Sequence, residues 1–288
     1  MNEAHIRSIG ELSAPDMNDE YFIYQAIIAG FPTDGVITES FIKRLSDYCI
    51  KVVREAKVHS NWSSPNEEYE NACLHFISQL FAENNPFPCS VYACFEKVAM
   101  PAAVYSLTQT LVKITAPGIP DIYQGCELWD LSFVDPDNRR PVDYGLRRHQ
   151  LSVLKEEEKK GVPQLLSFLE ERRLEGLEKL YVTWKALQLR REYPALFTKG
   201  EYIPIYSDNA HAVIAYARRY DDQWCLVVAP LMAACRHGEE EVRSRIALPG
   251  GAPLEWRNVF TDEAITVEEG KLPVSILDRF PVALLMNV

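Results

Sequence analysis

The chain has 288 residues, of which 47% are apolar and 25% charged, a composition typical of a globular protein that can bury a core. Its 41 acidic and 30 basic residues leave a formal charge of −11, so no electrostatic footprint favours a nucleic-acid partner. The apolar runs are too short to cross a bilayer, and the start after Met1 is polar, which together predict a cytoplasmic protein without a membrane partner.

The first third of the chain predicts helices. Residues 1–19 are polar and aperiodic and predict a loose tail, whereas apolar residues recur at spacings of three and four across residues 20–111. Thr38 is the expected N-cap of one helix, and Ser-Pro-Asn-Glu at residues 64–67 is a capping box that starts another. Pro101 predicts a kink or a break in the helix that follows.

The middle of the chain predicts a barrel-type unit. Residues 116–118 form a turn, and residues 119–123 are interpreted as a short strand that leads into a long polar loop. Helix, strand and then a loop rich in functional side chains is the order of a βα unit in a TIM-type barrel. A second helical block, with a solvated charged face, is expected from Val162 to about Glu192.

Beyond Pro194 the apolar period changes from helical to alternating, which predicts short strands separated by Gly, Pro and Asp turns. We expect Asp221 and Asp222 to form a hairpin turn and Trp224 and Trp256 to be buried in the strands. The series favours an antiparallel β-sandwich or barrel with a structural role. The expected strands cover residues 202–206, 211–220, 224–230, 246–248, 256–260, 264–267 and 282–286.

The predicted fold class is therefore α/β plus all-β, divided into three parts. Residues 1–115 form a helical region, residues 116–198 hold the barrel strand, the substrate loop and the final helices, and residues 199–288 form the β-sandwich domain. The seven cysteines lack the close spacing of a metal site, so we expect free, buried thiols, no metal and no cofactor.

The densest chemistry lies in residues 118–145, GIPDIYQGCELWDLSFVDPDNRRPVDYG. Glycosidic chemistry needs two carboxyl groups on opposite sides of the scissile bond, whereas Asp135 and Asp137 come from one short segment. Neighbouring cations also lower a carboxyl pKa, which disfavours a general acid near neutral pH. Two interpretations stay open: the ions bind sugar hydroxyls beside a flat Trp129 or Tyr123 ring, or they pair with one another and shape the loop.

Four segments carry a family resemblance. PGIPDIYQGCELWD (residues 117–130) resembles the last barrel strand and following loop of the α-amylase superfamily, and ELWDLSFVDPDNRRPVDYG (residues 127–145) resembles the maltooligosyl trehalose synthases, which build a trehalose end on maltodextrins. NDEYFIYQAIIAGFP (residues 18–32) and REAKVHSNWSSPNEEYE (residues 54–70) are similar to upstream segments of those synthases, in the same order. The resemblance therefore spans essentially the whole chain.

The resemblance implies the C-terminal part of a retaining glucosylmutase, with the last βα unit of its barrel. Such an enzyme converts the reducing-end α-1,4 linkage of a maltooligosaccharide to an α,α-1,1 linkage. The family's three catalytic acids follow earlier strands, and none of their motifs occurs here, so we expect no catalytic residue in this chain, no activity of the chain alone, and the N-terminal catalytic part as its partner. The expected substrate-binding residues are Lys57, His59, Trp62, Tyr123, Gln124, Glu127, Trp129, Asp135, Asp137, Asn138, Arg139 and Arg140.

Alternatives remain at this stage. The chain could be a non-catalytic maltodextrin-binding module or a fragment of another α-amylase-type hydrolase. Cys126 and Phe133 stand where the family pattern has Thr and Leu, and Ser60-Asn61 where it has Thr-Ser, which leaves individual substrate contacts open. Trp62 could equally be core between helices, and Glu127 could support Arg139. An unpaired barrel strand edge predicts self-association of the chain.

Overall fold

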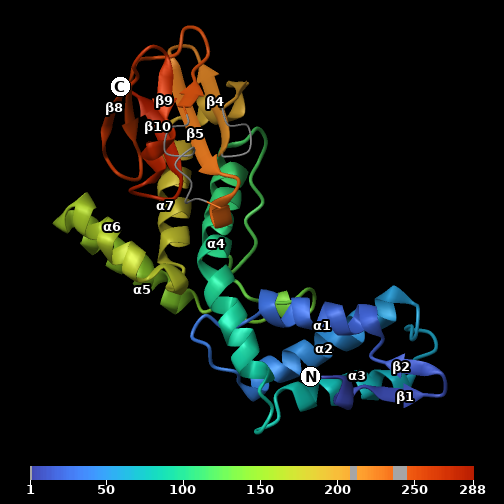
Figure 1. Cartoon of the computed structure of the whole chain (residues 1–288). Coiled ribbons are helices and arrows are strands. Elements are labelled where there is room, and N and C mark those ends of the chain that lie inside the picture. Colours follow the sequence, from blue (N-terminus) through green and yellow to red (C-terminus); the bar gives the residue numbers. More distant parts are fainter. Residues whose placement is uncertain (1, 208–212, 236–244) are drawn as a thin grey trace. The chain divides into compact units, whose positions relative to one another are not determined.

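The computed structural model describes residues 2–207, 213–235 and 245–288. The chain forms two compact units (Figure 1). Unit 1 comprises Met1–Lys97 and Leu131–Pro141, and unit 2 comprises Val98–Asp130 and Val142–Val288. None of the helices in the described part of the chain is both long and apolar enough to cross a bilayer.

Unit 1 contains three complete helices and a hairpin. The helices are α1 (Met17–Ala29), α2 (Glu39–Ala56) and α3 (Glu67–Leu80), and the antiparallel hairpin of β1 (Arg7–Ile9) and β2 (Leu12–Ala14) follows a short 3-10 helix, η1 (Glu3–His5). Their apolar stripes meet in one buried core. Its buried members are Ala14, Ile23, Ala26, Ile27, Phe31, Phe41, Leu45, Cys49, Val53, Tyr69, Ala72, Cys73, Phe76, Ile77, Leu80, Phe87, Val91 and Phe133.

The prediction of a loose N-terminal tail is wrong. Ser8 pairs with Ser13 in the hairpin, Gly10 makes the turn at φ 62°, and Ala14 is fully buried. Ile9 and Leu12 pack against the core of unit 1. The segment of residues 7–14 has too few apolar residues to show a period in the sequence. Its packing against the core of unit 1, rather than a local pattern, orders it.

The helix caps follow the sequence in part. The Thr38 hydroxyl accepts a hydrogen bond from the Phe41 N–H at 3.1 Å, as predicted. The predicted capping box does not begin α3, because Asn66 is the N-cap and accepts from the Tyr69 N–H at 3.2 Å. The Ser64 N–H instead donates to the Asn61 side chain at 2.8 Å, which keeps residues 61–64 in a turn.

Helix α4 (Phe87–Thr115) contributes residues to both units and continues through Pro101, so the predicted break does not occur. Proline lacks the N–H that would bond the carbonyl of Lys97 one turn earlier. The boundary between the units, Lys97/Val98, falls at this turn. The tertiary packing of 29 helical residues overrides the local cost of one proline.

The remaining helices belong to unit 2. They are α5 (Tyr144–Lys160), α6 (Val162–Glu171), α7 (Leu177–Glu192) and the single turn α8 (Pro194–Thr198). The predicted helical block corresponds to α6 and α7. Helix α5 was not predicted, because its highly charged sequence has a single buried residue, Leu154, and no clear apolar period.

The predicted strand at residues 119–123 does not form in the chain by itself, and its place in a barrel stays a prediction. These residues belong to no described sheet, and the Ile119 side chain is 96% exposed. A strand needs a neighbour that accepts its N–H groups, and none of the described strands pairs with this segment.

The described strands of unit 2 are antiparallel, so mixed helix and antiparallel sheet is confirmed. Six form one sheet in the order β3-β4-β5-β10-β7-β8, and β6 and β9 form a separate pair. A sandwich of two full sheets stays a prediction, and the start of the expected 211–220 strand lies outside the described residues. The strands are β3 (Glu201–Ile205), β4 (Val213–Tyr220), β5 (Gln223–Pro230), β6 (Arg245–Ala247), β7 (Glu255–Asn258), β8 (Ala264–Thr266), β9 (Lys271–Pro273) and β10 (Ala283–Asn287).

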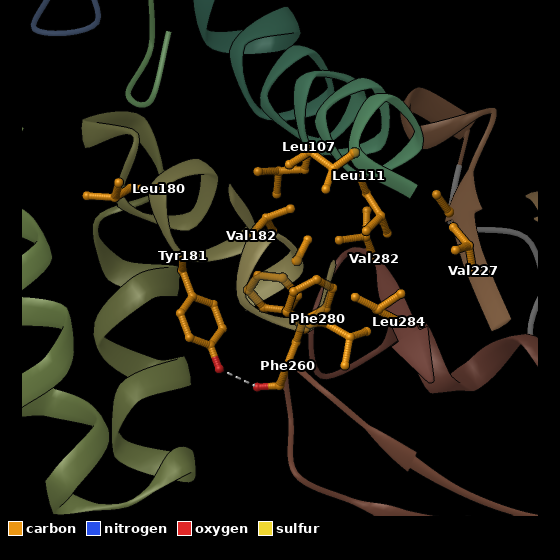
Figure 2. Close-up of a cluster of buried hydrophobic side chains, with 14 of the residues drawn as sticks. Leu107, Leu111, Leu180, Tyr181, Val182, Val227, Phe260, Phe280, Val282 and Leu284 are labelled. Carbon is orange, nitrogen blue, oxygen red and sulfur yellow. Dashed lines mark hydrogen bonds between the residues drawn. The ribbon is translucent and has the colours of Figure 1, made fainter. Parts of the chain in front are cut away.

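The central strands are buried on both faces. Along β5, Val227 lies in the core that the helices share, whereas the next residue, Val228, lies in a second core with Trp224 and Trp256. Both tryptophans are buried, as predicted. Figure 2 shows Leu107 and Leu111 of α4 beside side chains of the sheet, and the Tyr181 hydroxyl donating to the Phe260 carbonyl at 2.9 Å.

A buried arginine ties these helices to the sheet. Arg218 on β4 donates to the carbonyl of Thr115, the last residue of α4, at 3.0 Å and to the carbonyls of Phe197 and Gly200 at 3.0 and 2.9 Å. Burial lowers the pKa of Arg218. Its positive charge meets the carbonyl ends of two helices, where the helix dipole is negative.

Cys49, Cys73, Cys89, Cys94, Cys126 and Cys225 are free thiols, as predicted. Cys49, Cys73 and Cys225 are buried. The prediction of burial is wrong for Cys89 and Cys94, which are exposed on α4.

Candidate functional site

The dense segment of residues 118–145 divides between the two units. Residues 131–141 belong to unit 1, and residues 118–130 and 142–145 belong to unit 2. The predicted site residues therefore form separate groups, and each group has its own surroundings.

A pocket of about 270 Å³ lies between α2 and the loop of residues 131–141. The loop carries three of the predicted residues into it, and α2 supplies a row of polar side chains that were not predicted. The lining residues are Ser40, Lys43, Arg44, Asp47, Tyr48, Lys51, Val134, Asp135, Pro136, Asp137 and Arg140.

Asp137 is the centre of this loop. Its carboxylate accepts two hydrogen bonds at 2.8 Å from the Arg44 guanidinium and one at 2.7 Å from the Phe133 N–H, and Arg140 lies 2.9 Å away. Burial alone would raise the pKa of Asp137, but the bonds from Arg44 and Phe133 outweigh it and the pKa is lowered. A carboxylate held in this way shapes the loop and is a poor general acid.

The other loop residues are more open. Arg139 forms an ion pair with Asp135, and both side chains are partly exposed. Lys51 donates to the backbone carbonyl of Asp135, and the Asn138 side-chain oxygen is buried without a hydrogen-bond partner among the described residues. Arg139 and Arg140 therefore present guanidinium surface to solvent, whereas the Asp135 and Asp137 carboxylates form ion pairs within the loop.

Sequence reasoning missed Arg44 and Lys51, and the signal was present. Both lie on the face of α2 that also carries Tyr48, at spacings of three and four residues. Phe133 stacks on the Tyr48 ring with centroids 5.0 Å apart and contacts Gly30, where an added Cβ would lie 2.7 Å from the Phe133 ring. The segment of residues 18–32 therefore packs against the loop of residues 131–141 through a close contact at Gly30.

A second group brings residues 54–70 onto the start of α1. The His59 Nε2 lies 2.7 Å from the Asp16 carboxylate, and the Tyr69 hydroxyl donates to Asp19 at 2.6 Å. Burial would raise the pKa of Asp16, but bonds from the Asp19 N–H and His59 keep it lowered, whereas burial raises the pKa of Asp19 despite the Tyr69 bond. The pKa values of these two carboxyl groups are therefore shifted in opposite directions.

Within the described residues, Asp16, Asp19 and His59 form the one cluster whose ligand atoms, all within 4.8 Å of one another, could hold a metal ion. Asp16 already bonds His59, and Asp19 already bonds Tyr69. These mutual bonds satisfy the groups without an ion.

Arg54 and Glu70 in this segment form what we call a fork, in which one guanidinium donates to both oxygens of one carboxylate. Arg54 donates to the two Glu70 carboxylate oxygens at 2.8 and 2.7 Å, and the Ser60 hydroxyl donates to one of them at 2.5 Å. Trp62 is 53% exposed, so it is not core between helices. Lys57 is exposed and ends α2 in the left-handed conformation at φ 57°, which turns the chain out of the helix.

In unit 2, Tyr123 and Gln124 are exposed, whereas Glu127 and Trp129 are engaged. Glu127 accepts from Arg147 of α5 at 2.9 Å, so its described partner is not Arg139. The Trp129 Nε1 donates to the Arg173 carbonyl at 2.8 Å, and the ring packs against the core beneath Lys179. Gly176 allows this close approach, because an added Cβ would lie 2.7 Å from the Trp129 nitrogen.

Comparisons with known proteins agree with this arrangement. No family model matches the chain. Its fold is similar to that of maltooligosyl trehalose synthases of known structure: the maltooligosyltrehalose synthase from Arthrobacter ramosus superposes with a TM-score of 0.73 at 26% identity, covering 93% of this chain and 32% of that one. A second crystal structure of a maltooligosyl trehalose synthase gives 0.72 at 29% identity, covering 94% of this chain and 33% of that one.

Among curated proteins, the chain is 30% identical over 276 residues to a putative maltooligosyl trehalose synthase of Mycobacterium tuberculosis, a stretch that covers 95% of this chain and 32% of that protein. The resemblance that the sequence motifs indicated is confirmed: nearly the whole chain is similar to maltooligosyl trehalose synthases. The chain spans about a third of the length of the relatives that it matches.

Proposed function

We propose that the chain is the C-terminal portion of a glucosylmutase that converts the reducing-end α-1,4 linkage of a maltooligosaccharide to an α,α-1,1 linkage. The observation that carries this is the 30% identity over 95% of the chain to a putative maltooligosyl trehalose synthase. The matching fold of the Arthrobacter ramosus enzyme, at a TM-score of 0.73, supports it.

The motif contacts in unit 1 support the same proposal. Three segments that resemble those synthases meet there: Phe133 of one packs against Gly30 of another, and Tyr69 of the third bonds Asp19. Separate segments that fit one another by close contacts and hydrogen bonds form one functional unit. In our proposal this unit walls off the reducing end of the glucan, because an intramolecular transfer must exclude water.

The binding side chains in this proposal are the exposed ones. Lys57, Trp62, Arg139 and Arg140 offer donors and a ring face to a sugar, whereas Asp137 has its carboxylate occupied by Arg44. Tyr123 and Gln124 of the exposed segment also contact the glucan. Asp137 has a lowered pKa and Asp135 is paired with Arg139, so neither is the proton donor in our proposal.

We further propose that residues 119–123 become a barrel strand against the N-terminal catalytic part. The unpaired backbone and the 96% exposed Ile119 side chain of this segment support a missing neighbour. The catalytic acids in this proposal reside in that N-terminal part, and the chain alone is inactive.

The test is a titration of reducing ends with the purified chain and maltohexaose, with free glucose followed in parallel. We expect no change with the chain alone, and a loss of reducing ends with little free glucose once the N-terminal part of a related synthase is added. Loss of reducing ends by the chain alone contradicts the claim that it lacks catalytic acids. Glucose release in place of transfer points to a hydrolase.

A further inference from the structure

Trp62 combines exposure with a fixed position. More than half of its surface, 53%, is in contact with solvent. Even so, its Nε1 donates to the Glu55 carboxylate at 3.2 Å, and the Arg54 guanidinium carbon lies 5.0 Å from the ring centroid. A large indole in water normally either buries itself or samples several rotamers, so an exposed ring held from one side is a feature that a ligand can use.

Arg54, which lies against the Trp62 ring, is itself fixed by two hydrogen bonds to Glu70. Both guanidinium nitrogens that face Glu70 are bonded, and the Glu70 side chain is only 6% exposed. The buried Ser60 hydroxyl donates to the same carboxylate and accepts from the Asn66 N–H at 2.9 Å. The chain on both sides of Trp62 is therefore tied to one buried carboxylate, with Arg54 as the link between that carboxylate and the ring.

We propose that Glu70, acting through Arg54, is the residue that positions Trp62, the ring that the proposed function already sets against a glucose unit of the maltooligosaccharide. The identity of the sugar rests on the proposed function. A pyranose has an apolar C–H face and a polar rim; the indole matches the face, and exposed Lys57 and Glu55 supply a donor and an acceptor near it in the chain. A ring already held in position loses less conformational entropy on binding.

A matched control variant distinguishes a loss of ring positioning from a general loss of stability. Arg173 and Glu178 in unit 2 form a fork of the same kind, at 2.7 and 2.9 Å, whereas Trp62 belongs to unit 1. Glu70→Gln and Glu178→Gln therefore replace the same side chain in two buried forks. Only the former should affect the position of the Trp62 ring.

The experiment measures maltohexaose affinity of the full chain by calorimetry, with circular dichroism and thermal unfolding to show that each variant is folded at the assay temperature. We expect Trp62→Ala to weaken binding about tenfold or more, as central aromatic contacts do. Glu70→Gln should weaken it about three- to tenfold and Arg54→Lys similarly, because a single ammonium cannot grip both carboxylate oxygens. Glu178→Gln should leave it unchanged.

A spectroscopic readout completes the test. Maltohexaose should change the tryptophan fluorescence of the wild type and of Glu178→Gln, and this change should be lost in Trp62→Phe. Unchanged affinity of Trp62→Ala, an equal loss in Glu70→Gln and Glu178→Gln, or no binding to the wild-type chain would each overturn the inference. The reaction of the chain with an added N-terminal part is measured separately, so the proposed function can fail while the positioning of Trp62 stands, and the reverse.

Discussion

Each unit contains an arginine that grips a buried glutamate through two hydrogen bonds, and the two forks differ in a way that their geometry does not show. The Arg54–Glu70 distances are 2.8 and 2.7 Å, and the Arg173–Glu178 distances are 2.7 and 2.9 Å. The Arg54 bond is the largest influence on Glu70 and lowers its pKa, whereas burial is the largest influence on Glu178 and raises its pKa.

The difference comes from what surrounds each carboxylate. Glu70 receives a third hydrogen bond from Ser60, whereas the Glu178 side chain is 1% exposed and feels the negative charge of Glu170. A fork alone does not decide whether a buried carboxylate prefers its charged form; the balance between donors and desolvation does. The two forks can therefore be separated by experiment.

The largest expected effect is at Arg173. Arg173→Met leaves the Glu178 carboxylate buried without its partner, and we expect a loss of about 3–5 kcal/mol in the free energy of unfolding at neutral pH. Arg54→Met should cost less, because Ser60 still donates to Glu70. Urea unfolding of both variants checks this, and equal losses would contradict the distinction between the forks.

The pH dependence should differ in sign. The lowered pKa of Glu70 contributes stability that is present above its unfolded pKa of about 4.3 and is lost as the pH falls through the folded pKa. The raised pKa of Glu178 contributes stability that is full below about pH 4.3 and is lost as the pH rises through the folded pKa.

Unfolding by urea from pH 7 to pH 3.5, on Glu70→Gln, Glu178→Gln and the wild type, measures these slopes. As the pH falls, the advantage of the wild type over Glu70→Gln should shrink, and its stability relative to Glu178→Gln should rise. Parallel slopes for the two variants would show that the surroundings of the two carboxylates are equivalent.

The smallest effect is expected at an exposed pair. Lys43 and Asp47 are 2.7 Å apart, as close as the atoms of the forks, but their side chains are 75% and 66% exposed. Lys43→Gln should change the free energy of unfolding by no more than about 0.5 kcal/mol, because water screens the pair. A larger loss by urea unfolding would mean that distance, not burial, decides what an ion pair contributes.

Much of the fold could be predicted from the sequence, and the failures have physical causes. The Thr38 cap, the helices of unit 1 and the buried Trp224 and Trp256 follow from local patterns. The hairpin of residues 7–14 was missed because it is ordered by packing against the core of unit 1. Helix α5 was missed because its highly charged sequence shows no clear apolar period.

The candidate site was predictable in its segments but not in its contacts. The dense loop and residues 54–70 were identified by their content, yet Asp137 is bonded by Arg44, which lies 93 residues away in the chain. The sequence also treated Trp62 and Trp129 alike as candidate sugar contacts. In the structure Trp62 is exposed, whereas Trp129 packs against a core with its Nε1 bonded to a backbone carbonyl.

The sequence by itself determined the helical and alternating periods, the Thr38 cap, and the motifs that resemble the maltooligosyl trehalose synthases. These features depend on neighbours within a few residues, which the chain order specifies. Only the tertiary structure decided which carboxylates are occupied, which tryptophan faces solvent and which way each glutamate pKa shifts. Those properties depend on burial and on donors brought together from distant segments, such as Arg44 at Asp137 and Ser60 and Arg54 at Glu70.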